Sequence, residues 1–175
     1  MTPEDLVGLA IDVAEEGLEA GELPIGAVVA LGDEIVGRSH AMERSQRRRL
    51  VHADLLAMEQ ADRALGARNR RLSGEHSKAP LRLAVNLEPC LMCLGAAMAL
   101  VVDEIYFGLE APSDGAAGVP AVWQPAAPDA DFCRIPPLTG GIRRARCLDQ
   151  FRRYVQAAPD SGFRTWAQGL ASLPA

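Results

Sequence analysis

Apolar positions in the first part of the chain change from helical spacing to strand spacing. Over residues 3–20 they recur every three or four positions, which predicts an amphipathic helix. Thr2 offers a capping hydroxyl before a first-turn proline, and Gly21 ends the run. A short apolar run, a Gly-Asp turn and a second apolar run then predict a β-hairpin over residues 25–36. The chain therefore begins with a helix followed by a hairpin.

The rest of the chain continues to alternate between the two periodicities. The patterns predict further elements in the order helix 53–65, strand 81–86, helix 90–100, strand 104–108, short strand 132–135 and helix 142–155. Between them lie an arginine-rich connection, a polar loop and a loop rich in Ala, Pro and Gly, at residues 37–49, 66–79 and 111–130. Strands that alternate with helices predict an α/β layered domain whose site lies where helices begin beside the sheet.

Composition limits the class of protein. The chain has 175 residues, 49% of them hydrophobic and 23% charged, which favours one compact domain; we expect it over residues 1–158, with a C-terminal tail over 159–175. A net charge of -5 argues against a protein that coats nucleic acid, so an RNA-binding role needs a local basic patch. No apolar stretch approaches the roughly 20 residues of a membrane helix. The first residues lack the basic start of a secretory signal, and we expect a cytoplasmic protein without membrane contact.

Three side chains carry the spacing of a metal site. Cys90 and Cys93 are three residues apart at a predicted helix start, where the helix dipole favours the thiolate form. His52 precedes a second predicted helix. One imidazole and two thiolates form the three-ligand set of a catalytic zinc, with a fourth position left for water. A capping histidine with two core thiols is the alternative for each feature alone, but their combination favours Zn²⁺.

Asp54 is the candidate catalytic group. It lies two residues after His52, an offset that a regular helix does not direct at the same ion. A carboxylate at this position can instead move the proton of a water that the metal activates. The alternative is a first-turn acid that only complements the helix dipole.

These residues resemble a known family. His52-Ala53-Asp54 and Pro89-Cys90-Leu91-Met92-Cys93 are similar to the H-x-E and P-C-x-x-C signature of zinc nucleobase deaminases. The resemblance extends to Glu22–Val29, to Asn86–Cys90 and to the segments Ile105–Gly108 and Gly115–Gly118, and it covers most of residues 3–155. The similarity is to the cytidine deaminase superfamily, and within it to bacterial tRNA adenosine deaminases and guanine deaminases.

The resemblance implies a fold, a reaction and roles for single residues. The fold is an α/β domain with a central mixed β-sheet sandwiched by α-helices, in a homodimer. The reaction is hydrolytic deamination with zinc held by His52, Cys90 and Cys93, and Asp54 in the place of the catalytic Glu. Aspartate is shorter by about 1.5 Å, and a misplacement of about 1 Å can cost about a hundredfold in rate. The pocket must compensate, or the chain is slow or inactive. Candidate substrate contacts are His40, Ala53 and Glu88; Glu88 can instead hold the strand-to-helix turn.

Three functions remain open. The acidic balance and the loss of tRNA-contact residues typical of the family favour a free nucleobase or related small heterocycle as substrate. A tRNA wobble adenosine-to-inosine deaminase is the alternative, because basic residues are clustered in Arg47–Arg49, in Arg68, Arg70 and Arg71, and in Arg143, Arg144 and Arg146. The third hypothesis is not an enzyme: the chain would be a catalytically impaired subunit that partners an active homologue.

Overall fold

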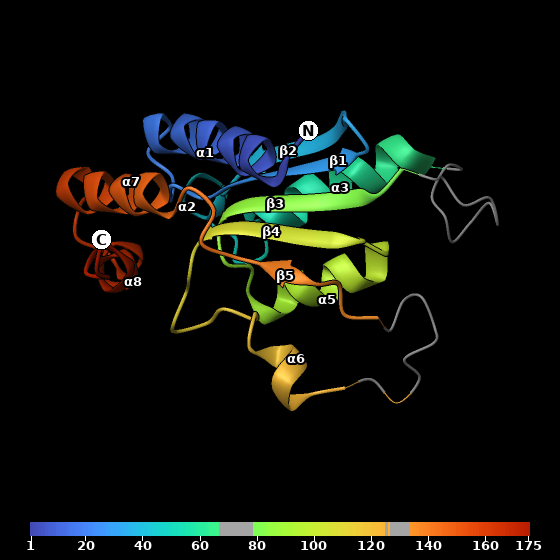
Figure 1. The fold of residues 1–175 in the computed structure, drawn as a ribbon. Helices are drawn as coiled ribbons and strands as arrows, with labels where there is room; N and C mark the ends of the chain where they lie inside the picture. Colours follow the sequence, from blue (N-terminus) through green and yellow to red (C-terminus); the bar gives the residue numbers. More distant parts are fainter. Residues whose placement is uncertain (67–78, 125, 127–133) are drawn as a thin grey trace.

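A five-stranded mixed sheet forms the centre of the molecule (Figure 1). The computed structural model describes residues 1–66, 79–124, 126 and 134–175. The strand order is β2-β1-β3-β4-β5; β1 pairs antiparallel with β2 and β3, whereas β3, β4 and β5 run parallel. The strands are β1 (Gly26–Leu31), β2 (Glu34–His40), β3 (Leu81–Leu87), β4 (Glu104–Leu109) and β5 (Leu138–Thr139).

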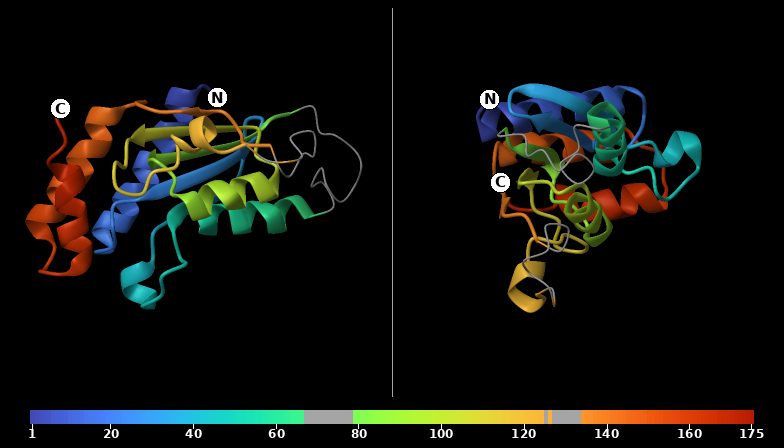
Figure 2. Two further views of the ribbon diagram at one scale, coloured as in Figure 1. Left: turned by 90° about the horizontal axis from the view of Figure 1, so that it is seen from below. Right: turned by 90° about the vertical axis from the view of Figure 1, so that its right-hand side faces the viewer.

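Helices cover both faces of this sheet. Helices α1 (Pro3–Glu19) and α7 (Arg144–Ala157) lie on one face (Figure 1). Helices α3 (Ala53–Leu65) and α5 (Leu91–Leu100) lie side by side on the other (Figure 2). The buried apolar side chains of sheet and helices form one core cluster. The expected α/β fold, a mixed sheet sandwiched by helices, is confirmed.

Two glycines set how closely helices approach the sheet. A Cβ added at Gly26 of β1 would lie 2.2 Å from the backbone nitrogen of Ala14 in α1. A Cβ added at Gly37 of β2 would lie 2.1 Å from the carbonyl oxygen of Ala57 in α3. Neither separation is sterically possible, so glycine at these two positions allows α1 and α3 to rest directly on opposite faces of the hairpin.

Local signals place most helix starts correctly. Thr2 caps α1, and it forms a reciprocal capping box with Asp5. His52 and Cys90 are the N-cap residues of α3 and α5, so both predicted helices begin beside the expected metal ligands. The prediction of a loop from residue 37 is wrong in part. Strand β2 continues to His40, and the one-turn helix α2 (Glu43–Gln46) follows it.

The edge of the sheet differs from the prediction. Residues 132 and 133 of the expected strand 132–135 lie outside the described residues, and Arg134 and Ile135 are not in a strand. The edge strand is β5, where Leu138 is the register partner of Ile105. The Ile105 backbone N–H also donates to the Pro137 carbonyl oxygen. Because prolines lack the donor that a ladder needs, pairing begins only after Pro137.

A buried hydrogen-bond network ties the sheet to the helices around it. The Asn86 side chain of β3 is fully buried, accepts from Gly26 N and donates to the oxygens of Pro24 and Gln150. Gln150 of α7 donates in turn to the Ile11 carbonyl oxygen. Because these buried polar groups satisfy one another, the network fixes the β3 end near the expected site.

The segment expected as a tail contains a further helix, α8 (Gly162–Ala171). The Ser161 hydroxyl accepts from Arg164 N and caps it. Trp166 packs edge-on against Phe151 of α7, with ring centroids 6.2 Å apart. Of the helices that the structure describes, none is long and apolar enough to cross a membrane.

Candidate metal centre and active site

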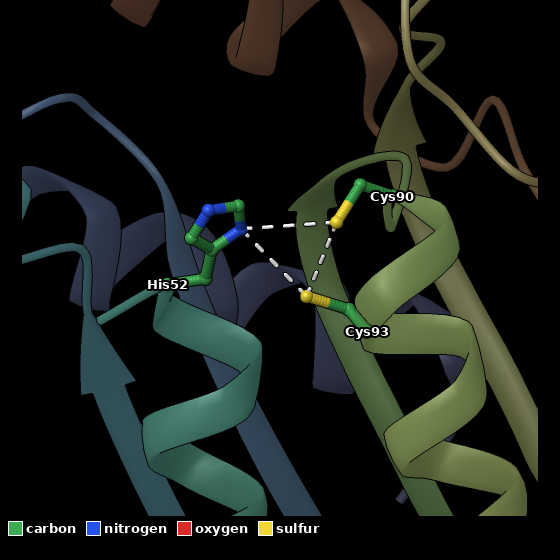
Figure 3. A group of neighbouring side chains, drawn as sticks. All are labelled: His52, Cys90 and Cys93. Carbon is green, nitrogen blue, oxygen red and sulfur yellow. Dashed lines mark hydrogen bonds between the residues drawn. The ribbon is translucent and has the colours of Figure 1, made fainter. Parts of the chain in front are cut away.

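His52, Cys90 and Cys93 converge at the N-termini of two neighbouring helices (Figure 3). Nδ1 of His52 lies 3.8 Å from Sγ of Cys90 and 3.7 Å from Sγ of Cys93. The two sulfur atoms are 3.5 Å apart. The three side chains therefore direct one nitrogen and two sulfur atoms at a common point.

These separations fit a tetrahedral zinc ion. With Zn–S distances of about 2.3 Å and Zn–N distances of about 2.05 Å, neighbouring ligands are separated by about 3.8 Å (S to S) and about 3.6 Å (S to N). The observed edges of 3.5 to 3.8 Å lie within 0.3 Å of these values. The donor set is the one that zinc prefers. His52, Cys90 and Cys93 can hold Zn²⁺ and leave one coordination position open.

The protonation states of the metal-free site follow from the close contact of these groups. The Cys93 thiol, and then His52, lower the pKa of Cys90 to about 4. The Cys90 sulfur raises the pKa of His52 to about 9, against the effect of burial. The same sulfur, together with burial, raises the pKa of Cys93. Near neutral pH the site therefore combines a Cys90 thiolate, a His52 imidazolium and a Cys93 thiol.

Asp54 lies against the metal centre. Its side chain is buried, and its Oδ1 accepts a hydrogen bond from the Cys93 thiol over 2.9 Å. The same oxygen accepts from Leu55 N in the first turn of α3. Burial raises the pKa of Asp54, which suits a group that must exchange a proton during a reaction.

A cavity of about 760 Å³ opens beside these side chains. Its volume lies within the range of about 300–1,000 Å³ that is typical of small-molecule and cofactor sites. Strand β1 begins and strand β3 ends beside it, and α8, which the sequence did not predict, forms part of its lining. The side chains that line it include Ile25, Val85, Leu87, Phe163 and Trp166.

Arginines line the mouth of this cavity. Arg47, Arg48 and Arg49 follow α2, are exposed, and all line the cavity, as does Arg44. Within the described part of the chain, no carboxylate forms an ion pair with the three exposed arginines. Positive charge at this mouth can attract an anionic ligand such as a phosphate.

The cluster of Arg143, Arg144 and Arg146 does not line this cavity. Arg68, Arg70 and Arg71 lie outside the described residues. In the cluster Arg143–Arg146, Arg144 forms a bidentate ion pair with Glu110. The Nη2 atom of Arg146 lies 3.7 Å from Oδ1 of Asp12. Arg143 donates to the Glu4 carbonyl oxygen. This cluster on and before α7 therefore holds the fold together.

The three expected substrate contacts have different surroundings. Ala53 lines the cavity. Glu88 also lines it, but its two carboxylate oxygens accept from the backbone N–H groups of Ala111 and Ala117 and so hold the loop after β4. His40 does not line the cavity: it lies beside Gly17 of α1, and its Nδ1 is 2.7 Å from the Ala41 carbonyl oxygen.

Two buried acids near the site were not singled out by the sequence. Glu43 of α2 lines the cavity and is 8% exposed, and its Oε1 lies 3.8 Å from Nε2 of His52. Burial raises the pKa of Glu43. Glu22, which is 2% exposed, accepts from the backbone N–H groups of Arg44 and Ser45 and so fixes α2. The one available signal was that Glu43 is the sole acid between His40 and His52.

Comparison with known proteins agrees with this site. The family model of the cytidine and deoxycytidylate deaminase zinc-binding region matches residues 1–109. A tRNA-specific adenosine deaminase of Bacillus subtilis is 38% identical over 119 residues, which are 67% of this chain and 69% of the relative. A tRNA(Ile)-lysidine synthase of Deinococcus deserti is 35% identical over 88% of this chain, which spans only 28% of that longer protein.

Solved structures share the fold. A structure from a study of A-to-I editing by tRNA:A34 deaminases has a TM-score of 0.66 at 28% identity, covering 83% of this chain and 98% of its own. A guanine deaminase from Nitrosomonas europaea has a TM-score of 0.66 at 20% identity, covering 87% and 84%, and supports the fold alone. With the matched metal centre, the chain belongs to the cytidine and deoxycytidylate deaminase family of zinc-binding proteins.

Proposed function

We propose that the chain is a zinc-dependent hydrolytic deaminase that acts on adenosine within RNA, with tRNA as the first candidate substrate. The observation that carries the proposal is a metal centre with an adjacent buried carboxylate, at the base of a cavity whose mouth is lined by arginines. The 38% identity to a tRNA-specific adenosine deaminase supports tRNA over a free base.

Each group of residues at the site has a separate role in this reaction. Bound zinc supplies a nucleophile by lowering the pKa of water. Asp54 lies where it can take up a proton and return it to the departing amine, and its burial keeps that proton exchange away from bulk water. The cavity walls orient the base, with Phe163 and Trp166 available for stacking. Arg47, Arg48 and Arg49 bind flanking phosphates.

A free nucleobase, which the sequence favoured, becomes the second candidate. Its support is the acidic net charge and the engagement of the cluster Arg143–Arg146 in the fold. A free base, however, presents no phosphate to the exposed arginines at the mouth of the cavity. We therefore place RNA first.

The test measures deamination by zinc-loaded protein. A tRNA transcript with adenosine at the wobble position, the same transcript with guanosine there, free adenine and free guanine are incubated separately. Inosine is measured in digested RNA, and ammonia is measured in all samples. We expect inosine only in the adenosine transcript, and none with Asp54→Ala. Ammonia from a free base alone would overturn the RNA proposal. If native protein with a full zinc content deaminates none of these substrates and the Asp54→Glu variant does, the result would support the catalytically impaired partner subunit.

We also propose that the chain forms a homodimer through α5 and the one-turn helix α6 (Val119–Val122). Leu91 and Val122 are 65% and 86% exposed, and Trp123 is 48% exposed. They line an apolar groove with Leu94, Met98 and Val119. A contiguous exposed apolar surface of this kind is typical of an interface. Sedimentation should give twice the chain mass for the native protein and the chain mass for Val122→Asp; a native monomer at high concentration would refute this.

A further inference from the structure

Glu43 has a buried carboxylate oxygen that lacks a hydrogen-bond donor among the described residues. Its side chain is 8% exposed, and Oε2 is buried without a hydrogen-bond partner among the described residues. A buried acceptor without a donor costs about 1–3 kcal/mol, so this carboxylate has acceptor capacity left for a neighbouring N–H group. Glu43 also lies beside a metal ligand, because its Oε1 is 3.8 Å from Nε2 of His52.

The two nitrogens of His52 face different groups. Nδ1 faces the sulfur atoms of Cys90 and Cys93, whereas Nε2 faces Glu43. When an imidazole binds a metal through one nitrogen, the other carries the proton and donates it to a neighbouring acceptor. Among the described residues, Glu43 is the carboxylate on that side.

The backbone around Glu43 holds it in this place. The Glu22 carboxylate accepts from Arg44 N over 3.0 Å and from Ser45 N over 2.7 Å, which fixes the first turn of α2 directly after Glu43. Met42 N donates to the Val51 carbonyl oxygen, which ties the start of α2 to the residue before His52. The distance between the Glu43 and His52 side chains therefore depends on a short, doubly anchored segment rather than on a free loop.

We propose that Glu43 is a positioning residue for the metal centre: it accepts the Nε2–H of His52 and thereby fixes the imidazole ring with Nδ1 directed at the zinc. A hydrogen-bonded carboxylate behind a histidine ligand orients the ring and makes its other nitrogen a stronger donor to the metal. The proposal concerns zinc binding, so it does not depend on which substrate the chain deaminates.

The test compares zinc affinity in Glu43→Gln, Glu43→Ala and the native chain. Affinity is measured at fixed pH by competition with a chromophoric chelator, without substrate. We expect Glu43→Ala to bind zinc about 10–100-fold more weakly, and Glu43→Gln to lose less, because its amide oxygen can still accept from Nε2–H. Glu59→Gln is the control, since Glu59 is exposed on α3, the helix that His52 caps, and its carboxylate pairs with Arg63.

A spectroscopic readout separates positioning from a structural role. Co²⁺ in the same site gives visible bands that depend on ligand geometry, so we expect these bands to shift in both Glu43 variants and not in Glu59→Gln. Circular dichroism verifies that each variant is folded, and Glu43→Gln, nearly equal in size to the native residue, serves if Glu43→Ala does not fold. Native zinc affinity and an unchanged Co²⁺ spectrum in Glu43→Gln and Glu43→Ala would overturn the proposal.

Discussion

The Cys93 thiol donates a hydrogen bond of 2.9 Å to Oδ1 of Asp54, so the carboxylate touches one of the three metal ligands. Aspartate is shorter than the glutamate of related deaminases by about 1.5 Å. The contact with Cys93 shows that Asp54 reaches the metal centre despite this difference. The buried environment that raises its pKa therefore acts on a group in direct contact with a candidate metal ligand.

Replacement of Asp54 by Asn should remove activity and keep the metal. The amide has nearly the same volume but cannot exchange a proton, so we expect kcat to fall at least about a hundredfold. Zinc content, measured by atomic emission, should stay at the native level because Asp54 is not one of the three ligands. Glu59→Gln, at an exposed position of the same helix, is the control and should keep native activity. Retention of more than a tenth of native kcat by Asp54→Asn would rule out the proton-transfer role.

Zinc binding should release about two protons per chain near neutral pH. The His52 imidazolium, with its pKa raised to about 9, must lose its proton to bind the metal, and so must the Cys93 thiol, whose pKa is also raised. Cys90, with its pKa lowered to about 4, is already a thiolate and contributes none. Zinc affinity should therefore rise about a hundredfold per pH unit between pH 6 and 8. Calorimetry in buffers of different ionisation enthalpy counts the protons, and a count near zero would contradict the assigned protonation states.

The convergence of the three candidate zinc ligands could be predicted because their signals are local. The spacing of Cys90 and Cys93 and the position of His52 before a helical run are both visible in the sequence. His40 shows what local signals miss. It is the register partner of Gly26, and cross-strand partners point to the same face of a sheet. A Cβ added at Gly26 would point at α1, so the side chain of its partner His40 also points to that helix and away from the cavity.

The elements that the sequence did not predict depend on distant partners. Helix α8 is short, and its packing comes from the contact of Trp166 with Phe151, fifteen residues earlier. The two-residue strand β5 exists because β4 offers it a free edge. Glu43 is buried in a one-turn helix that Glu22, in the connection between α1 and β1, holds through two backbone hydrogen bonds. Helix α2 and strand β5 leave no periodic pattern in the chain. Helix α8 does leave one, because Phe163, Trp166, Ala167 and Leu170 recur at helical spacing, and the expectation of a tail missed it.

Replacement of Asn86 by Ala should destabilise the whole domain. The change leaves Gly26 N–H, the Pro24 carbonyl and the Gln150 side chain without their buried partner. Because each unsatisfied buried group costs about 1–3 kcal/mol, we expect the free energy of unfolding in urea to fall by about 3 kcal/mol or more. Gln124→Ala removes an exposed amide and should change it by less than about 0.5 kcal/mol. A loss below about 1 kcal/mol in Asn86→Ala would mean that water or a neighbouring group replaces the amide.

Neutralising the arginines at the cavity mouth should change the salt dependence of tRNA binding. Arg47, Arg48 and Arg49 are exposed beside the cavity, and each phosphate contact contributes about 0.7–0.9 to the slope of log affinity against log salt concentration. Replacement of all three by Gln should therefore reduce that slope by about two and weaken binding at low salt. Arg146→Gln is the control, because Arg146 lies on α7 and faces Asp12. If the triple variant binds with the native slope while Arg146→Gln lowers it, the RNA backbone follows α7 and the proposed path past α2 is wrong. If neither variant changes the slope and affinity is weak at all salt concentrations, a free base becomes the better substrate candidate.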